Sequence, residues 1–136
     1  MNRLMFASGV VVAGTAVVHL VAGQIDPVRP LLAATMNESS KWTLHACWHL
    51  VSADLVLAAA VLVYLARNDD PGIAAPRLIS AHFLAYGLVF IVIGLTSAGP
   101  RGLVVLPQWV LLLPVAALAW AATVPSRRHM LSASVT

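Results

Sequence analysis

The sequence predicts an all-α fold: an integral membrane four-helix bundle with up-and-down topology and both termini cytoplasmic. The composition is the first reason, since 60% of the residues are hydrophobic and only 10% are charged, against about 45–50% and 25% in soluble domains. The second is a set of four apolar runs, each near the roughly 20 residues that a helix needs to cross the hydrocarbon of a bilayer. One core of a 136-residue chain cannot hide this much apolar surface. Lipid is therefore the expected solvent.

The four predicted spans are helices, because backbone groups in lipid must form their hydrogen bonds internally. They cover residues 4–23, 42–66, 78–98 and 106–124. Turn-forming residues separate them: Asp26-Pro27, Asn68-Asp69-Asp70-Pro71-Gly72 and Gly99-Pro100-Arg101-Gly102. The first run exceeds the 7–15 apolar residues of a signal peptide, so we expect it to be retained as a membrane helix. Residues 1–125 form one transmembrane domain, followed by a polar tail over 126–136.

Basic residues predict the orientation, because cytoplasmic loops carry an excess of lysine and arginine. Five lie on the side of the termini: Arg3, Arg67, Arg77, Arg127 and Arg128. Three lie on the other side: Arg29, Lys41 and Arg101. Near that outer side, Trp42, Trp48 and Trp109 resemble an aromatic belt. We expect the cytoplasmic (inner) membrane of a bacterium.

The same charges indicate the partners. The net charge of +3 is spread over helix ends, where it meets lipid head groups. The lipid bilayer is therefore the expected partner, and nucleic acid is not. A homo-oligomer or a larger membrane complex is compatible with the sequence.

Four histidines lie inside the apolar runs, where ionisable groups are costly and often functional: His19, His45, His49 and His82. His45 and His49 share a helix face, because residues four apart are neighbours. His19 of the first helix is expected at the same depth. Three imidazoles suit a transition metal ion (zinc, iron or copper), and two facing imidazoles suit haem. The leading hypothesis is a metal or haem site at His19, His45 and His49, for redox chemistry or metal handling.

Two other interpretations of these histidines stay open. They can form interhelical hydrogen bonds, worth about 0.6–2 kcal/mol each, or they can handle protons. His82 is expected nearer the inner surface, in a different site with a hydrogen bond inside the bundle. Tyr86 lies one turn further along the same face. The single cysteine, Cys47, excludes an intramolecular disulfide and a cysteine-only metal site.

Asp54 is the second informative residue, because an acid near the middle of a span costs roughly 2.5–3.5 kcal/mol on insertion scales. Helical geometry points it about 140–180° away from the face of His45 and His49. The second helix therefore has neighbours on both sides, or one face meets another protein. Asp54 is expected to be a neutral acid bonded to a hydroxyl, or to pair with His82 or a backbone group. The alternative function is a proton-linked small-solute transporter that uses Asp54, His82 and Tyr86, or a structural accessory subunit.

The sequence does not decide whether the protein is an enzyme. It contains no serine–histidine–acid arrangement, phosphate-binding glycine loop or pair of catalytic carboxylates at a recognisable spacing. A membrane-embedded enzyme that acts on a lipid or a quinone therefore stays open.

Smaller features predict details of the fold. Gly9 with Ala13, and Gly87 with Gly94, predict close helix packing, either within the chain or between the subunits of an oligomer. Pro30 is expected to start a short interfacial helix. Ser39 or Ser40 is expected to cap the second span.

Overall fold

The computed structural model describes residues 1–68 and 72–124, and within these ranges the chain is helical and has no strand. The main helices are α1 (Arg3–Gly23), α3 (Glu38–Arg67), α4 (Ala74–Ala98) and α6 (Trp109–Ala121). Shorter elements connect them: a π-helical turn (Gln24–Val28), α2 (Arg29–Ala33), a 3₁₀ turn (Gly99–Arg101) and α5 (Gly102–Val105). Three helical segments are long and apolar enough to cross a membrane. The predicted all-α class and the four main helices are confirmed.

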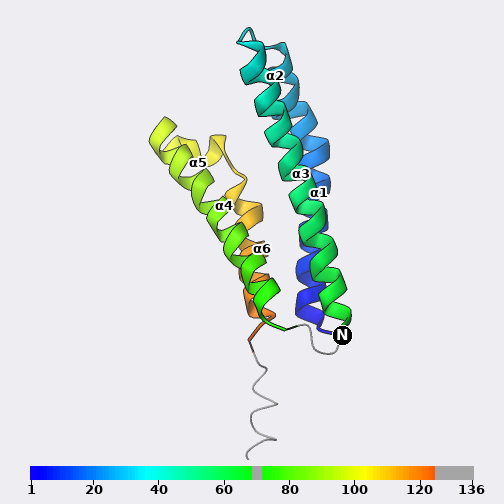
Figure 1. Cartoon of the computed structure of the whole chain (residues 1–136). Helices are drawn as coiled ribbons and strands as arrows, with labels where there is room; N and C mark the ends of the chain where they lie inside the picture. Colours follow the sequence, from blue (N-terminus) through cyan, green and yellow to red (C-terminus); the bar gives the residue numbers. More distant parts are fainter. Residues whose placement is uncertain (69–71, 125–136) are drawn as a thin grey trace, which may run out of the picture.

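The helices form two hairpins, α1 with α3 and α4 with α6 (Figure 1). The hairpins lie closest where the chain begins and diverge toward the opposite end (Figure 1). At the end where the hairpins lie closest, Asn2 joins the start of α1 to the ends of α3 and α6. Its backbone N–H donates to the Ala66 carbonyl over 2.9 Å, and its side-chain amide donates to the Ala122 carbonyl over 3.0 Å. Because the start of α1 meets the ends of α3 and α6, successive main helices alternate in direction.

Glycines allow the helices of each hairpin to approach closely. A Cβ atom at Gly9 would lie 2.7 Å from a valine methyl group of α3. A Cβ at Gly87 would lie 2.6 Å from a leucine methyl group of α6, and one at Gly102 would overlap the backbone of Gly94. The predicted close packing at Gly9, Gly87 and Gly94 is therefore confirmed within the chain.

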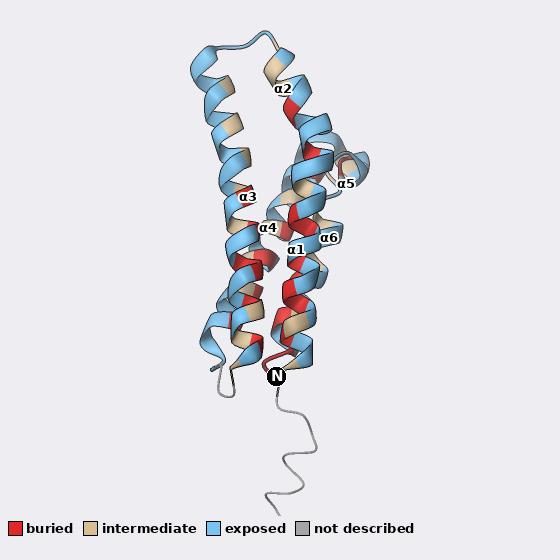
Figure 2. Ribbon diagram, turned by 90° about the vertical axis from the view of Figure 1, so that its right-hand side faces the viewer, coloured by how far each residue is buried: buried red, intermediate tan, exposed pale blue. Residues whose placement is uncertain are grey.

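The buried side chains concentrate in the half of the bundle where the hairpins meet (Figure 2). Met5, Leu62, Phe83 and Val115 come from the four main helices, and each is at most 1% exposed. The first buried residue of α3 is Ser52, so the half of this helix that precedes it has no buried side chain. The half of α3 that precedes Ser52 is therefore less enclosed by the rest of the protein than the half that follows it.

The fourth helix is shorter than predicted. The apolar run covers residues 106–124, whereas α6 has 13 residues, Trp109–Ala121. Leu106 has φ −118° and ψ 74°, outside the helical region, because Pro107 crowds the backbone of the residue before it. The chain before this break forms the separate helix α5 instead of extending α6.

Two connections test smaller predictions. The short helix expected at Pro30 is present as α2. The cap expected at Ser39 or Ser40 is wrong, because Asn37 caps α3 and its Oδ1 accepts the N–H of Ser40 over 3.3 Å. The predicted turn residues 69–71 and the polar tail over 126–136, with Arg127 and Arg128, lie outside the described residues.

Candidate functional site: a cavity between two hairpins

A cavity of about 830 Å³ lies between the hairpins. Its wall is mostly apolar and comes from all four main helices and from the residues just before α6. Seven lining residues carry a polar or sulfur-containing group: Thr15, His19, Asp26, Cys47, Trp48, Tyr86 and Gln108. Small-molecule sites typically have volumes of about 300–1,000 Å³, apolar walls and a few polar groups. The cavity has the size and the wall of such a site.

Beside the cavity, one hydrogen bond joins the two hairpins. Asp54 Oδ2 on α3 lies 2.9 Å from His82 Nε2 on α4. Their side chains are 33% and 38% exposed, so the rest of the protein does not fully enclose the pair. The His82 ring also contacts the Tyr86 ring, with 4.2 Å between centroids, and Tyr86 lines the cavity. The pairing of Asp54 with His82, one of the predicted alternatives, is confirmed.

This pair has a simple charge chemistry. A carboxylate with a neutral imidazole carries one negative charge, and one added proton makes the pair neutral. Gain or loss of a proton therefore changes the charge beside the cavity by one unit. Helix α6 contains no ionisable residue. The ionisable residues of α1 are Arg3, near its start, and His19, near its end.

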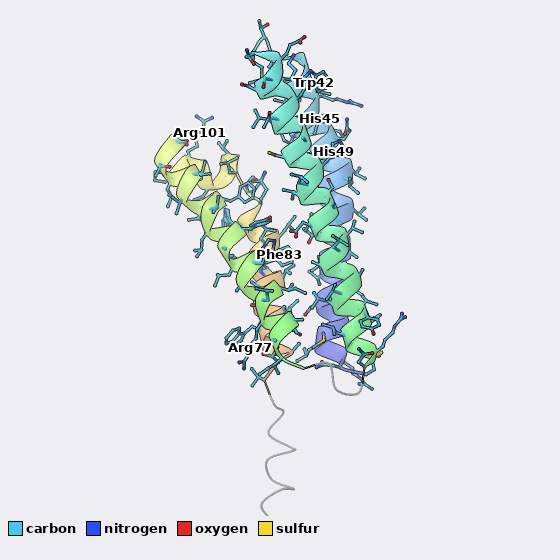
Figure 3. The ribbon with its side chains drawn as sticks, in the orientation of Figure 1. Trp42, His45, His49, Arg77, Phe83 and Arg101 are labelled. Carbon is cyan, nitrogen blue, oxygen red and sulfur yellow. The ribbon has the colours of Figure 1, made fainter. Side chains whose placement is uncertain are left out.

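His19, His45 and His49 gather around Trp48. The His19 ring stacks on the Trp48 indole with 4.7 Å between centroids, and His19 Nε2 lies 3.2 Å from the Trp48 carbonyl oxygen. The His49 ring meets the same indole edge-on at 4.8 Å, and the His45 ring lies 6.5 Å from it. Figure 3 shows His45 and His49 with Trp42 along the outer half of α3. The histidines thus share an aromatic neighbour.

The described residues therefore give the predicted metal site at His19, His45 and His49 no support. In the two ranges that the structure describes, no group of three or more His, Cys, Asp or Glu side chains can hold a metal ion. The physical reason is the Trp48 indole, which contacts His19 on one helix and His49 on the other. A haem iron between these helices would have to displace the indole, so the structure gives the haem alternative no support. His19 makes the interhelical hydrogen bond that was its second interpretation.

Trp48 and Gln108 are lining residues that the sequence analysis did not select. Each has a buried polar atom without a hydrogen-bond partner among the described residues, Trp48 Nε1 and Gln108 Oε1. Buried polar atoms of this kind call for an explanation, such as water or a ligand that satisfies them. The available signal was weak: Gln108 is a polar residue inside an apolar run, and Trp48 has the position of a belt residue.

A comparison of the chain with protein-family models, with curated proteins and with solved structures finds no match. Function is therefore argued from the geometry of the cavity and of the Asp54–His82 pair.

Proposed function

We propose that this chain is a small integral membrane protein that binds a small solute between its hairpins and exchanges it for a proton at Asp54 and His82. The observation that carries the proposal is the 2.9 Å hydrogen bond between these residues, because it links the two hairpins beside the cavity. Tyr86 contacts His82 and lines the cavity, so it connects the proton site to the solute site.

The apolar surface supports insertion into a membrane. Three helical segments are long enough to span it, and large apolar side chains such as Leu57 and Val92 are 65% and 56% exposed. These side chains would face lipid. Helix α6, at 13 residues, is about 20 Å long and falls short of a hydrocarbon layer of about 30 Å. Because α6 ends beside Asn2, where the chain begins, the length that it lacks is at the opposite end. In a bilayer the cavity would lie at that end.

The charges support one orientation. Arg77 lies at the end where the chain begins, and Arg101 lies at the opposite end (Figure 3). The first end also carries Arg3 and Arg67, and in the sequence Arg127 and Arg128 follow α6 on the same side. Five basic residues against three (Arg29, Lys41 and Arg101) favour the cytoplasm for this end. The cavity then opens toward the outer surface of the cytoplasmic membrane of a bacterium.

Proton and solute affect each other through charge. Two unit charges that lie several ångströms apart, in surroundings of low dielectric constant, interact with an energy of a few kcal/mol. A charged solute that enters the cavity therefore changes the proton affinity of the pair, and by linkage the proton changes the affinity for that solute to the same extent. This mutual dependence is what a proton-linked carrier requires.

The test is proton release on solute binding by the purified protein in a neutral detergent and a weak buffer with a pH-sensitive dye. Three probes of similar size are added in turn: tetraphenylphosphonium, tetraphenylborate and neutral triphenylphosphine oxide. We expect at least one probe to bind with release of up to one proton. Asp54→Asn should abolish the proton signal. Glu38→Gln, an exposed acid outside the cavity, is the control and should keep it.

Binding without any proton signal, or a signal that Asp54→Asn retains in full, would contradict the proposed exchange. Failure of all three probes to bind would contradict the solute site itself.

A further inference from the structure

The charge of the cavity wall indicates the class of solute. Asp26, which lies between α1 and α2, lines the cavity. In the described part of the chain no lysine or arginine lines it. The wall therefore has a carboxyl group and no fixed positive charge.

Aromatic side chains from both hairpins also favour a positively charged solute. Trp48 comes from α3, and Tyr86 and Phe90 come from α4. The face of an aromatic ring carries partial negative charge, and it attracts organic cations most strongly where water is displaced. A cation with an apolar body would meet aromatic side chains, a carboxyl group and aliphatic side chains in one cavity.

We infer that the solute is a monovalent organic cation with a bulky apolar body, of the quaternary ammonium or phosphonium type. The inference rests on the proposed function and names its solute. The Asp54–His82 pair lies next to Tyr86, so a cation in the cavity repels the proton that the pair carries. One cation enters and one proton leaves, and the total charge of the site is unchanged.

The test compares two ions of nearly the same size and shape, tetraphenylphosphonium and tetraphenylborate, by equilibrium dialysis against the protein in a neutral detergent. Protein-free micelles provide the background for each ion. We expect tetraphenylphosphonium to bind at least tenfold more tightly. Asp26→Asn should weaken its binding about three- to tenfold, because one charge of the wall is lost. Glu38→Gln is the matched control and should change the affinity less than twofold.

Two results overturn the inference and leave the proposed function intact: equal or tighter binding of the borate, and equal effects of Asp26→Asn and Glu38→Gln. In either case proton release at Asp54 can still accompany a solute of another class. If the cation, the anion and neutral triphenylphosphine oxide all fail to bind, the inference and the proposed function fall together.

Discussion

At the scale of single residues, Trp48 determines where the outer histidines lie. Helical periodicity places His45 beside His49, and the two rings are indeed 4.7 Å apart. Periodicity gives no information about the neighbouring helix. There the larger indole occupies the space in which a third imidazole was expected, and His19 stacks on it. Residues on one helix face were therefore predictable, whereas convergence between helices was not.

The Asp54–His82 pair was predictable only as one of several alternatives. The sequence identifies both as polar groups within apolar runs, and such groups seek a partner. Helix angles show that Asp54 points away from His45 and His49, but they do not show which helix lies there. The structure places α4 on that side and His82 within hydrogen-bonding distance.

Substitution of this pair separates a functional role from a structural one. We expect His82→Leu to lower stability by about 1–2 kcal/mol, because it leaves the Asp54 carboxyl without its partner. The double variant Asp54→Leu/His82→Leu should be about as stable as the unmodified protein, since apolar residues often replace an ion pair without loss. Thermal unfolding in detergent, followed by circular dichroism, measures both.

The double variant should also lose proton release on solute binding. A double variant that is less stable than His82→Leu would show that the pair mainly holds the hairpins together. Retained proton release would remove the pair from the proposed exchange.

At the scale of elements, the length and apolar character of each run were sufficient to predict α1, α3 and α4. The predicted spans end at or within a few residues of the observed helices, for example at Gly23 and Ala98. The exception is α6, where Pro107 forces Leu106 out of the helical region. Hydropathy does not detect this break, because α5, Leu106 and α6 are all apolar. Backbone restrictions before proline were the better guide to the boundary.

The glycines make a prediction about the contact between α4 and α5. A Cβ at Gly102 would overlap the Gly94 backbone, so Gly102→Ala should lower stability by about 2 kcal/mol or more. Gly14 is the matched control, because a Cβ there has no neighbour within 4 Å. Gly14→Ala in the interior of α1 should raise stability by about 0.5–1 kcal/mol. Thermal unfolding in detergent gives both values, and equal effects of the two substitutions would contradict the packing.

At the scale of the whole molecule, the divergence of the hairpins was not predictable. In a membrane protein a side chain that faces lipid and one that faces another helix are equally apolar, so the pattern does not reveal which helices separate. The pairing of α1 with α3 and of α4 with α6 is likewise left open by the sequence. The resulting cavity is the feature on which the functional proposals depend.

Cys47 reports on this cavity directly, because it is an exposed thiol that lines it and is the only cysteine of the chain. Maleimides react with thiolates, which form in contact with water and not in lipid. The control moves the thiol to a lipid-facing position of α3 in the double variant Cys47→Ala/Leu57→Cys, since Leu57 is 65% exposed and does not line the cavity.

The decisive measurement is labelling of Cys47 by a membrane-impermeant maleimide in right-side-out and inside-out vesicles from expressing bacteria. We expect rapid labelling in the right-side-out vesicles, slower labelling when tetraphenylphosphonium is present, and no labelling of the control thiol. Labelling of Cys47 only in inside-out vesicles, or only after solubilisation in detergent, would contradict a water-filled cavity that opens to the outer surface.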